Sequence, residues 1–233
     1  MQSEEKVVPS HLGIIMDGNR RWAQNQGLPT LEGHRKGADN IKTIARHAFD
    51  SGVKFVTFYA WSTENWKRGK DEIDYLMDLA IKIAAKEMRE LSKENVRVVV
   101  LGVDDNVPTK VIKAWRDAEE ESKDNTGGTI AICFNYGGSR ELLDATKSIV
   151  ASGVAADDVT EEMIADHLYH PEVPDVDFMI RTSGEQRISN FMLWRMRYAE
   201  LYFIDIHWPE FSTDDLDVAL ESFATRNRRM GGN

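Results

Sequence analysis

The sequence predicts one α/β domain built on a six-stranded, mostly parallel sheet flanked by helices. Six short apolar runs resemble strands that are covered on both faces, and helix-like stretches fall between most of them. The length of 233 residues suits one large domain. There is no internal repeat, low-complexity tract or long Pro/Gly linker. We therefore expect a flexible N-terminus over residues 1–10 and a single domain over residues 11–233.

The predicted strands are rich in β-branched and aromatic residues, which favour extended backbone. In chain order they cover residues 12–16, 54–60, 97–101, 129–134, 177–180 and 201–206. Strands that alternate with helices are typical of parallel sheets, because each parallel pair needs a crossover connection.

The predicted helices cover residues 36–51, 71–94, 109–123, 139–151, 161–168 and 214–229. The stretch 71–94 is the longest, about 36 Å at a rise of roughly 1.5 Å per residue, and its apolar face is unusually wide. Two interpretations of this helix stay open. It is either a core helix packed on the sheet or one wall of a long groove for an extended hydrocarbon.

Composition excludes several classes of protein. The formal charge of −10 argues against a nucleic-acid partner. Cys133 is the only cysteine, so the chain can form no internal disulfide and no cysteine-based zinc site. The N-terminus carries no signal-peptide core, and no apolar run reaches the roughly 20 residues of a membrane span. We therefore expect a cytoplasmic protein.

The first candidate site is the segment that follows the first predicted strand. Asp17, Gly18 and Asn19 favour a turn, and Arg20 and Arg21 follow at once. Ligands of open α/β sheets bind at the carboxyl ends of strands. An acid, a turn with free N–H groups and two arginines suit a diphosphate with a nearby metal ion. The alternative is an ordinary strand-to-helix turn in which Asp17 is the cap.

A second candidate segment follows the second strand, and in a parallel sheet it reaches the same edge as Asp17. Its residues are Ser62, Thr63, Glu64, Asn65, Trp66 and Arg68. The polar side chains can orient a ligand or the Asp17 carboxylate, Trp66 offers an apolar wall, and Arg68 can bind an anion. The alternative is the N-terminal turn of a helix, capped by Ser62 or Thr63.

A third candidate segment, after the fifth strand, carries Arg181, Arg187 and Ser189 beside a glycine turn. Two arginines and a hydroxyl suit a second diphosphate that is bound without a metal ion. The alternative is a network of surface ion pairs.

Two further residues extend the candidate site. Glu200 could complete a Mg²⁺ site with Asp17, because Mg²⁺ is usually held by one or two carboxylates together with phosphate and water oxygens. A solvated or salt-bridged acid is the alternative for Glu200. His34, at a predicted helix start, can donate a hydrogen bond to phosphate or serve as a structural donor.

Other chemistry is disfavoured by motifs that the chain lacks. It contains no Gly-x-x-x-x-Gly-Lys-Ser/Thr phosphate loop, no Gly-x-Gly-x-x-Gly fingerprint and no Gly-x-Ser-x-Gly nucleophile elbow. The first two absences argue against NTPases and dinucleotide enzymes, and the third argues against hydrolases that use this elbow.

Taken together, these segments resemble the cis-prenyltransferases, specifically the bacterial undecaprenyl diphosphate synthase type. The resemblance runs from residue 11 to residue 232. It rests on the order and spacing of residues 16–21, 33–34, 62–68, 135–138, 181–190, 198–203, 208–209 and 228–232. It implies Mg²⁺-dependent condensation of isopentenyl diphosphate onto an allylic diphosphate, usually farnesyl diphosphate, with formation of Z double bonds.

The resemblance also implies a homodimer with an apolar tunnel between the helices and the sheet, which supports the groove interpretation of residues 71–94. It implies a long, undecaprenyl-like product that supplies a lipid carrier for cell-wall glycan synthesis. Release of such a product suggests peripheral contact with the inner face of a membrane. The alternatives are a short-chain synthase and a non-catalytic partner subunit. The second is disfavoured because Asp17, His34 and Arg181 are present.

Residue roles follow from the resemblance. Gly18, Asn19 and Arg21 hold the allylic diphosphate, whose departure His34 assists, while Glu72 belongs to the mobile loop that positions both substrates. Glu200 and the Gly231/Gly232 tail reach the partner subunit's site. We assign catalytic roles to Asp17, His34 and Asn65, substrate binding to Gly18, Asn19, Arg20, Arg21, Trp22, His34, Ser62, Thr63, Glu64, Asn65, Trp66, Arg68, Arg181, Arg187 and Ser189, and metal binding to Asp17 and Glu200.

The chain departs from the family pattern at several positions. Arg20 and Gln186 stand where many members have glycine and histidine, and Thr30 stands where an arginine often helps to bind the allylic diphosphate. Gly128 takes the place of a larger residue that often closes the tunnel floor, and Ala60 is small where short-chain members are bulky. The last two departures favour a longer product.

Overall fold

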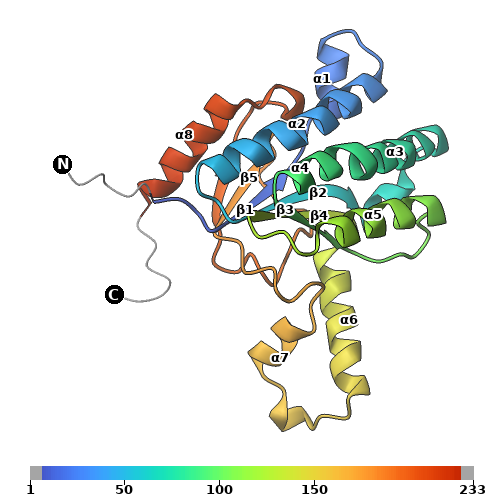
Figure 1. Ribbon diagram of the computed structural model, residues 1–233, viewed down its shortest axis with the longest axis vertical. Helices are drawn as coiled ribbons and strands as arrows, with labels where there is room; N and C mark the ends of the chain where they lie inside the picture. Colours follow the sequence, from blue (N-terminus) through green and yellow to red (C-terminus); the bar gives the residue numbers. More distant parts are fainter. Residues whose placement is uncertain (1–6, 227–233) are drawn as a thin grey trace.

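The computed structural model describes residues 7–226 and confirms the predicted α/β architecture (Figure 1). The strands are β1 (His11–Ile15), β2 (Phe55–Ser62), β3 (Val96–Leu101), β4 (Gly128–Tyr136), β5 (Phe178–Arg181) and β6 (Glu200–Phe203). They form one sheet in the order β3-β4-β2-β1-β5-β6. Every neighbouring pair is parallel, so the sheet is wholly rather than mostly parallel over the described residues.

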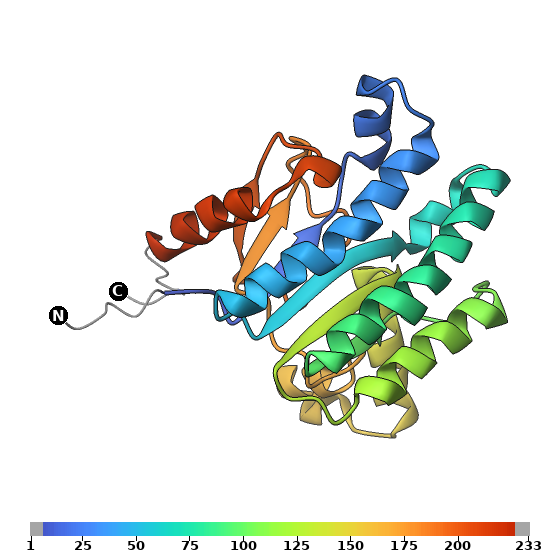
Figure 2. The same cartoon turned by 45° about the horizontal axis from the view of Figure 1, so that its top comes forward.

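The helices of the described chain pack mainly on one face of this sheet (Figure 2). They are α1 (Asn19–Asn25), α2 (Thr30–Asp50), α3 (Lys70–Lys82), α4 (Arg89–Lys93), α5 (Thr109–Ser122), α6 (Gly138–Ala151), α7 (Glu161–Asp166) and α8 (Thr213–Ala224). On this face the fully buried Leu12, Ile14 and Phe58 of the sheet meet Ile41 and Met88 of the helices. Burying such side chains is the main force that holds helices to a sheet.

The opposite face of the sheet is covered by irregular chain more than by helix. Buried Phe191, Met192 and Met196 come from the segment between β5 and β6 and pack with Met179 and Tyr136. The helices α6 and α7 contact each other at one end of the molecule (Figure 1). The single cysteine, Cys133, is fully buried in this second core as a small apolar residue.

The structure differs from the predicted elements at several boundaries. The last predicted helix, 214–229, ends at Ala224, and the last predicted strand, 201–206, ends at Phe203. The helix α1 was not predicted, because its seven residues carry no apolar period. The helix α2 begins at Thr30, six residues before the predicted start. The predicted helix 71–94 is interrupted by a π-helical stretch, Ile83–Met88, between α3 and α4. Side-chain periodicity does not distinguish such a single-turn interruption from a continuous α-helix.

Some expectations fall partly outside the described residues. Residues 1–6 of the predicted flexible N-terminus lie outside them. The end of this predicted segment is tied to the sheet, because the carbonyl of Ser10 accepts hydrogen bonds from the backbone N–H groups of Lys54 (3.0 Å) and Phe55 (2.9 Å). Gly231 and Gly232 also lie outside. Over residues 7–226, none of the helices combines the length and apolarity that a membrane crossing requires.

A buried ion pair joins α6 to the irregular segment that covers the second core. Arg195 and Glu141 are 2% and 1% exposed, and Arg195 Nη1 lies 2.7 Å from Glu141 Oε1. The hydroxyl of Tyr136 donates to the other carboxylate oxygen (2.5 Å), and Arg195 also donates to the carbonyls of Val173 and Tyr169. Each charge is therefore hydrogen-bonded as well as paired, which offsets its desolvation.

We expect the substitution Arg195→Met to lower the free energy of unfolding by about 3–5 kcal/mol, because it leaves the Glu141 carboxylate buried without a partner. Denaturant unfolding measures this. Lys113→Met breaks the solvent-exposed pair with Asp117 and serves as the control, with an expected loss of about 0.5 kcal/mol or less. Equal losses in the two variants would contradict a special role for the buried pair.

His11 is a fully buried histidine at the start of β1. Its Nδ1 donates to the carbonyl of Pro174 (2.9 Å), so Nε2 is the acceptor for the hydroxyl of Thr57 (2.7 Å). Burial lowers the pKa of His11 to about 4, although the Pro174 carbonyl opposes this shift. The folded protein therefore prefers the neutral ring.

This preference makes stability depend on pH. The folded-state pKa lies below the unfolded value of 6.5, so the contribution is complete above pH 6.5 and is lost as the pH falls toward 4. We expect His11→Gln to remove up to about 3 kcal/mol of this pH dependence. Unfolding titrations of both proteins between pH 7 and pH 4 test it, and parallel curves would refute it.

Candidate active site

Three segments that are far apart in sequence meet at the carboxyl edge of the sheet. Asp17 follows β1, Ser62 ends β2 and Arg181 ends β5. Since β1 lies between β2 and β5 and all three are parallel, the three segments leave the sheet side by side. The structure thus brings together the three candidate segments that the sequence predicted at one edge.

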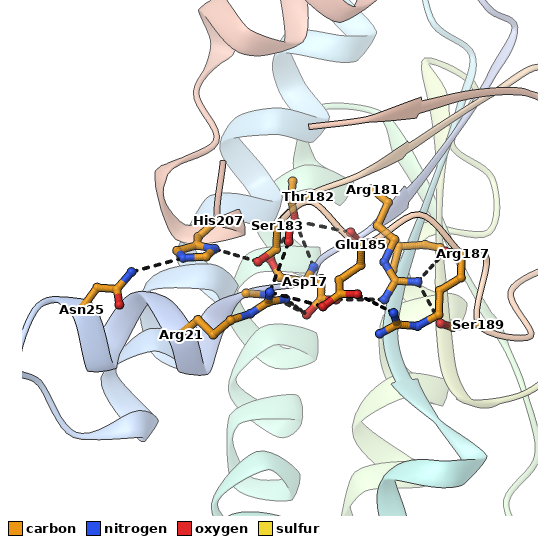
Figure 3. Close-up of polar contacts among 12 residues, drawn as sticks. Asp17, Arg21, Asn25, Arg181, Thr182, Ser183, Glu185, Arg187, Ser189 and His207 are labelled. Atoms are coloured by element: carbon orange, nitrogen blue, oxygen red, sulfur yellow. Dashed lines mark hydrogen bonds and ion pairs between the residues drawn. The ribbon is translucent and has the colours of Figure 1, made fainter. Parts of the chain in front are cut away.

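An ion pair between Asp17 and Arg181 lies at the centre of this edge (Figure 3). Arg181 Nη2 donates to Asp17 Oδ2 over 2.9 Å, and Arg181 is only 3% exposed. The backbone of Asp17 is fixed as well, because its N–H donates to Thr182 Oγ1 (3.0 Å) and its carbonyl accepts from the same hydroxyl (2.7 Å). Thr182 was not predicted as part of the site.

The electrostatic environment keeps Asp17 ionised. Burial alone would raise the pKa of this carboxyl, but the favourable contacts around it, led by the hydrogen bond and charge of Arg181, together outweigh burial and lower it. The Gly18 N–H, 2.7 Å from Oδ1, and the charge of Arg21 act in the same direction. Asp17 is therefore an anion at neutral pH and can bind a cation.

Position 18 requires glycine, for reasons of both backbone conformation and space. Its φ of 100° is in the left-handed region, and a Cβ there would lie 2.6 Å from Ser183 Oγ and 2.7 Å from His207 Nδ1. Ser183 and His207 are themselves hydrogen-bonded at 2.7 Å and lie directly beneath the turn. Gly18 is the N-cap of α1 without a side-chain cap bond, so the alternative of Asp17 as helix cap is not observed.

The candidate second diphosphate site lies on the other side of Arg181 (Figure 3). Arg181 Nη1 donates to Ser189 Oγ (2.8 Å) and to the carbonyl of Arg187. Arg187 is paired with Glu185 (2.5 Å), which also lies 3.4 Å from Arg21. The ion-pair alternative therefore holds for exposed Arg187, whereas buried Arg181 is a fixed part of the site.

The segment after β2 is a short 3-10 helix, Thr63–Lys67 (labelled η1 below). Ser62 caps it, and Asn65 Oδ1 accepts the Ser62 N–H (3.1 Å) in a reciprocal capping box. The helix-turn alternative is therefore correct for this segment. It does not replace the site interpretation, because Ser62, Asn65 and Arg68 line the same cavity as Asp17 and Arg181.

Residues from all three segments line a polar cavity of about 900 Å³ including its open mouth. Lining residues from the predicted set are Asp17, Asn19, His34, Ser62, Asn65, Arg68, Arg181, Arg187 and Ser189. Gly18, Arg20 and Arg21 line an adjoining polar cavity that shares Asp17 and Arg68. Trp22, Thr63, Glu64 and Trp66 line neither of these two cavities.

His34 and Arg68 meet at Glu72, the acid at the start of α3. His34 Nε2 donates to Glu72 Oε1 (3.3 Å), and Arg68 Nη1 donates to the same oxygen (3.0 Å). Burial and the charge of Arg68 lower the pKa of His34 to about 4, although Glu72 opposes this. At neutral pH His34 is therefore an uncharged N–H donor.

An apolar cavity opens from the polar one and runs between α2, α3 and the sheet. Its volume is about 580 Å³ including its open mouth. Both cavities are lined by Met16, Asn19, His34, Ala60, Trp61 and Leu76. Its wall ends at Ile83, where the π-helical stretch begins. Gly128 does not line this cavity, and a Cβ at Gly128 would lie 2.8 Å from the ring of Phe49.

Glu200 lies at the opposite edge of the sheet from Asp17. It begins β6 and pairs with Phe178, which in turn pairs with Leu12 near the start of β1. Its carboxylate accepts from Arg226 Nη1 (2.8 Å). A metal site made by Asp17 and Glu200 of one chain is therefore not formed, because the strand register separates the two carboxylates.

The donor groups at Asp17 fit a Mg²⁺ ion that is held mainly by its substrate. Over the described residues, no group of three or more His, Cys, Asp or Glu side chains is arranged to hold a metal. Asp17 nevertheless provides one ionised carboxylate beside a cavity lined by arginines. Mg²⁺ commonly takes one or two protein carboxylates and completes its octahedron with phosphate and water oxygens.

Comparison with known proteins agrees with this geometry. A family model described as "Putative undecaprenyl diphosphate synthase" matches residues 15–231. The isoprenyl transferase of Thermotoga maritima is 46% identical over 97% of both chains. That of Enterococcus faecalis is 48% identical over 98% of this chain and 88% of its own.

Two solved structures share the fold. Lavandulyl diphosphate synthase from Lavandula x intermedia, in complex with dimethylallyl diphosphate, has a TM-score of 0.94 and 33% identity, covering 98% of this chain and 100% of that one. A probable undecaprenyl diphosphate synthase from Campylobacter jejuni has a TM-score of 0.81 and 28% identity, covering 96% and 98%. The chain belongs to the undecaprenyl diphosphate synthase family and is a prenyltransferase.

Proposed function

We propose that this enzyme condenses isopentenyl diphosphate onto farnesyl or another allylic diphosphate and repeats the step to give a long Z-polyprenyl diphosphate. The observation that carries the proposal is the junction of two cavities, one lined by arginines and one apolar. A prenyl diphosphate likewise consists of a charged diphosphate and an apolar hydrocarbon chain. The bound dimethylallyl diphosphate of the lavandulyl enzyme supports an allylic substrate for this chain.

The two diphosphates bind on opposite sides of the Asp17–Arg181 pair. The allylic diphosphate takes the cavity formed by Gly18, Asn19 and Arg21, and its hydrocarbon extends past Ala60 into the apolar cavity. The isopentenyl diphosphate binds to Arg181, Arg187 and Ser189 through guanidinium and hydroxyl donors. Exposed Arg187 exchanges its partner Glu185 for phosphate oxygens.

Ionisation of the allylic diphosphate develops negative charge on the leaving group. Asp17 would hold a Mg²⁺ ion at this point, and the ion would supply positive charge that neutralises part of the leaving group's charge. The Arg21 guanidinium stabilises the rest more strongly in the transition state than before it, and the N–H of His34 adds to this once it exchanges Glu72 for a phosphate oxygen. Asn65 faces the same cavity and orients the condensing substrate.

A long product requires the apolar cavity to lengthen beyond Ile83. The buried residues of α2 and of the π-helical stretch include the small side chains Ala45, Ala48 and Ala84. Small residues leave helices free to separate at a modest loss of packing. A short-chain product is the second candidate, because Phe49 fills the space beside Gly128.

We also propose that the enzyme works as a cytoplasmic homodimer that touches a membrane surface when it releases its apolar product. The position of Glu200 favours the dimer, since Glu200 cannot assist Asp17 of its own chain. The same glutamate supplied by the partner subunit would then complete the site. In this role the enzyme supplies the lipid carrier for cell-wall glycan synthesis.

Product analysis tests the proposed function. Purified protein is mixed with farnesyl diphosphate, isopentenyl diphosphate and Mg²⁺, and products are measured by mass spectrometry beside an EDTA control. A Mg²⁺-dependent ladder that reaches undecaprenyl length supports the long-chain enzyme, and a ladder that stops after one or two additions supports the short-chain one. No product with farnesyl, geranyl or dimethylallyl primers indicates a non-catalytic subunit.

The variant Asp17→Asn is expected to lower kcat by about 10³-fold or more, because it removes the charge that holds Mg²⁺ while keeping the shape of the side chain. Steady-state kinetics measure this, with thermal unfolding as a check of the fold. Asp217→Asn, a surface change on α8, is the matched control. An Asp17→Asn enzyme within about tenfold of the wild type would remove Asp17 from the mechanism.

The variant Ala80→Leu is expected to shorten the product, since Ala80 is buried in the wall of the apolar cavity and leucine would fill part of it. The mass ladder should stop earlier, while the first condensation continues. Ala156→Leu places the same side chain on the surface and should leave the ladder unchanged. An unchanged ladder in Ala80→Leu would mean that the product does not enter this cavity.

A further inference from the structure

Asn190 lies where the segments that follow β2, β4 and β5 touch one another. It follows Ser189 in the turn after β5, and both residues have left-handed backbone, with φ of 63° and 48°. The carbonyl of Asn190 accepts a hydrogen bond from the N–H of Gly138 (2.7 Å), at the turn between β4 and α6. The backbone alone therefore ties the Ser189 turn to the end of β4.

The side chain of Asn190 binds in two directions. Its Oδ1 accepts from the backbone N–H (2.8 Å) and the hydroxyl (2.9 Å) of Ser139, while its Nδ2 donates to Glu64 Oε1 (3.2 Å). One amide therefore connects the segments that follow β2, β4 and β5.

This junction is tightly packed. A Cβ on Gly137 would lie 2.9 Å from Asn190 Nδ2 and 2.8 Å from Thr63 Oγ1. A Cβ on Gly138 would lie 3.1 Å from the carbonyl oxygen of Asn190. The two glycines therefore allow the chains to approach this closely, which a side chain at either position would prevent.

Neither Asn190 nor Glu64 lines the polar cavity, but each is next in sequence to a residue that lines it. Glu64 precedes Asn65 in η1, and Asn190 follows Ser189, whose hydroxyl is bound to Arg181. Burial raises the pKa of Glu64, but hydrogen bonds from its backbone, Asn190 and the Ser62 and Thr63 hydroxyls outweigh burial and lower it. The contact is therefore charge-assisted at neutral pH.

We propose that Asn190 is a positioning residue that sets the spacing between η1 and the Ser189 turn, and so between the two walls of the polar cavity. This inference rests on the proposed function, since those walls hold the two substrates. The amide donates to η1 on one side and accepts from the β4–α6 turn on the other. It keeps Asn65 and Ser189 in register while the exposed arginines move between partners.

The test is an exchange of donor and acceptor between the two side chains that share this hydrogen bond. Asn190→Asp places two carboxylates against each other but keeps an oxygen for Ser139. We expect it to raise the KM for isopentenyl diphosphate about tenfold or more. The double variant combines Asn190→Asp with Glu64→Gln, so that the new amide at position 64 donates to the new carboxylate at position 190. Most of the increase in KM should then disappear.

Two measurements separate this role from general damage to the fold. Thermal unfolding should be similar in the single and double variants, so the recovery must occur in kinetics alone. Ser139→Ala removes a hydroxyl bond without touching Glu64 and should change the KM less than Asn190→Asp does. An active wild type whose KM is unchanged by Asn190→Asp, or a double variant without recovery, overturns the inference. An inactive wild type overturns the proposed function instead.

Discussion

The ion pair between Asp17 and Arg181 is the interaction on which the rest of the site depends. It joins the ends of adjacent strands β1 and β5, and Arg181 is buried, so the guanidinium charge must be satisfied within the protein. The other terminal nitrogen of Arg181 reaches Ser189 and the Arg187 carbonyl. One buried guanidinium therefore orients the acid on one side and the second anion site on the other.

The two faces of the sheet give the two halves of the site different mechanical properties. The segment that carries Arg187 and Ser189 is held over the second core by the buried Arg195–Glu141 pair and by Asn190. The opposite face is closed by helices whose buried residues include several alanines, and a π-helical stretch separates α3 from α4 there. A fixed wall for phosphate and a deformable wall for hydrocarbon suit an enzyme whose product lengthens while its reacting end stays in place.

The sequence predicted those parts of the fold and site that depend on local patterns. The strand ends at Asp17, Ser62 and Arg181 were recognisable because an apolar run stops there and turn residues with charged neighbours follow. The roles of Thr182, His207 and Asn190 depend on contacts between distant segments, which no local pattern records. Glu200 was misplaced beside Asp17 of its own chain, because strand register decides which edge it occupies.

Equilibrium binding of the two substrates tests the central claim most directly. Isopentenyl diphosphate and a non-reactive allylic thiodiphosphate can be titrated into the protein separately and together, with Mg²⁺ or with EDTA. The account predicts two sites per chain, of which the allylic site needs Mg²⁺ and Asp17 while the isopentenyl site needs Arg181 and persists in EDTA. A single shared site, or loss of both sites in EDTA, would contradict the division of the cavity by the Asp17–Arg181 pair.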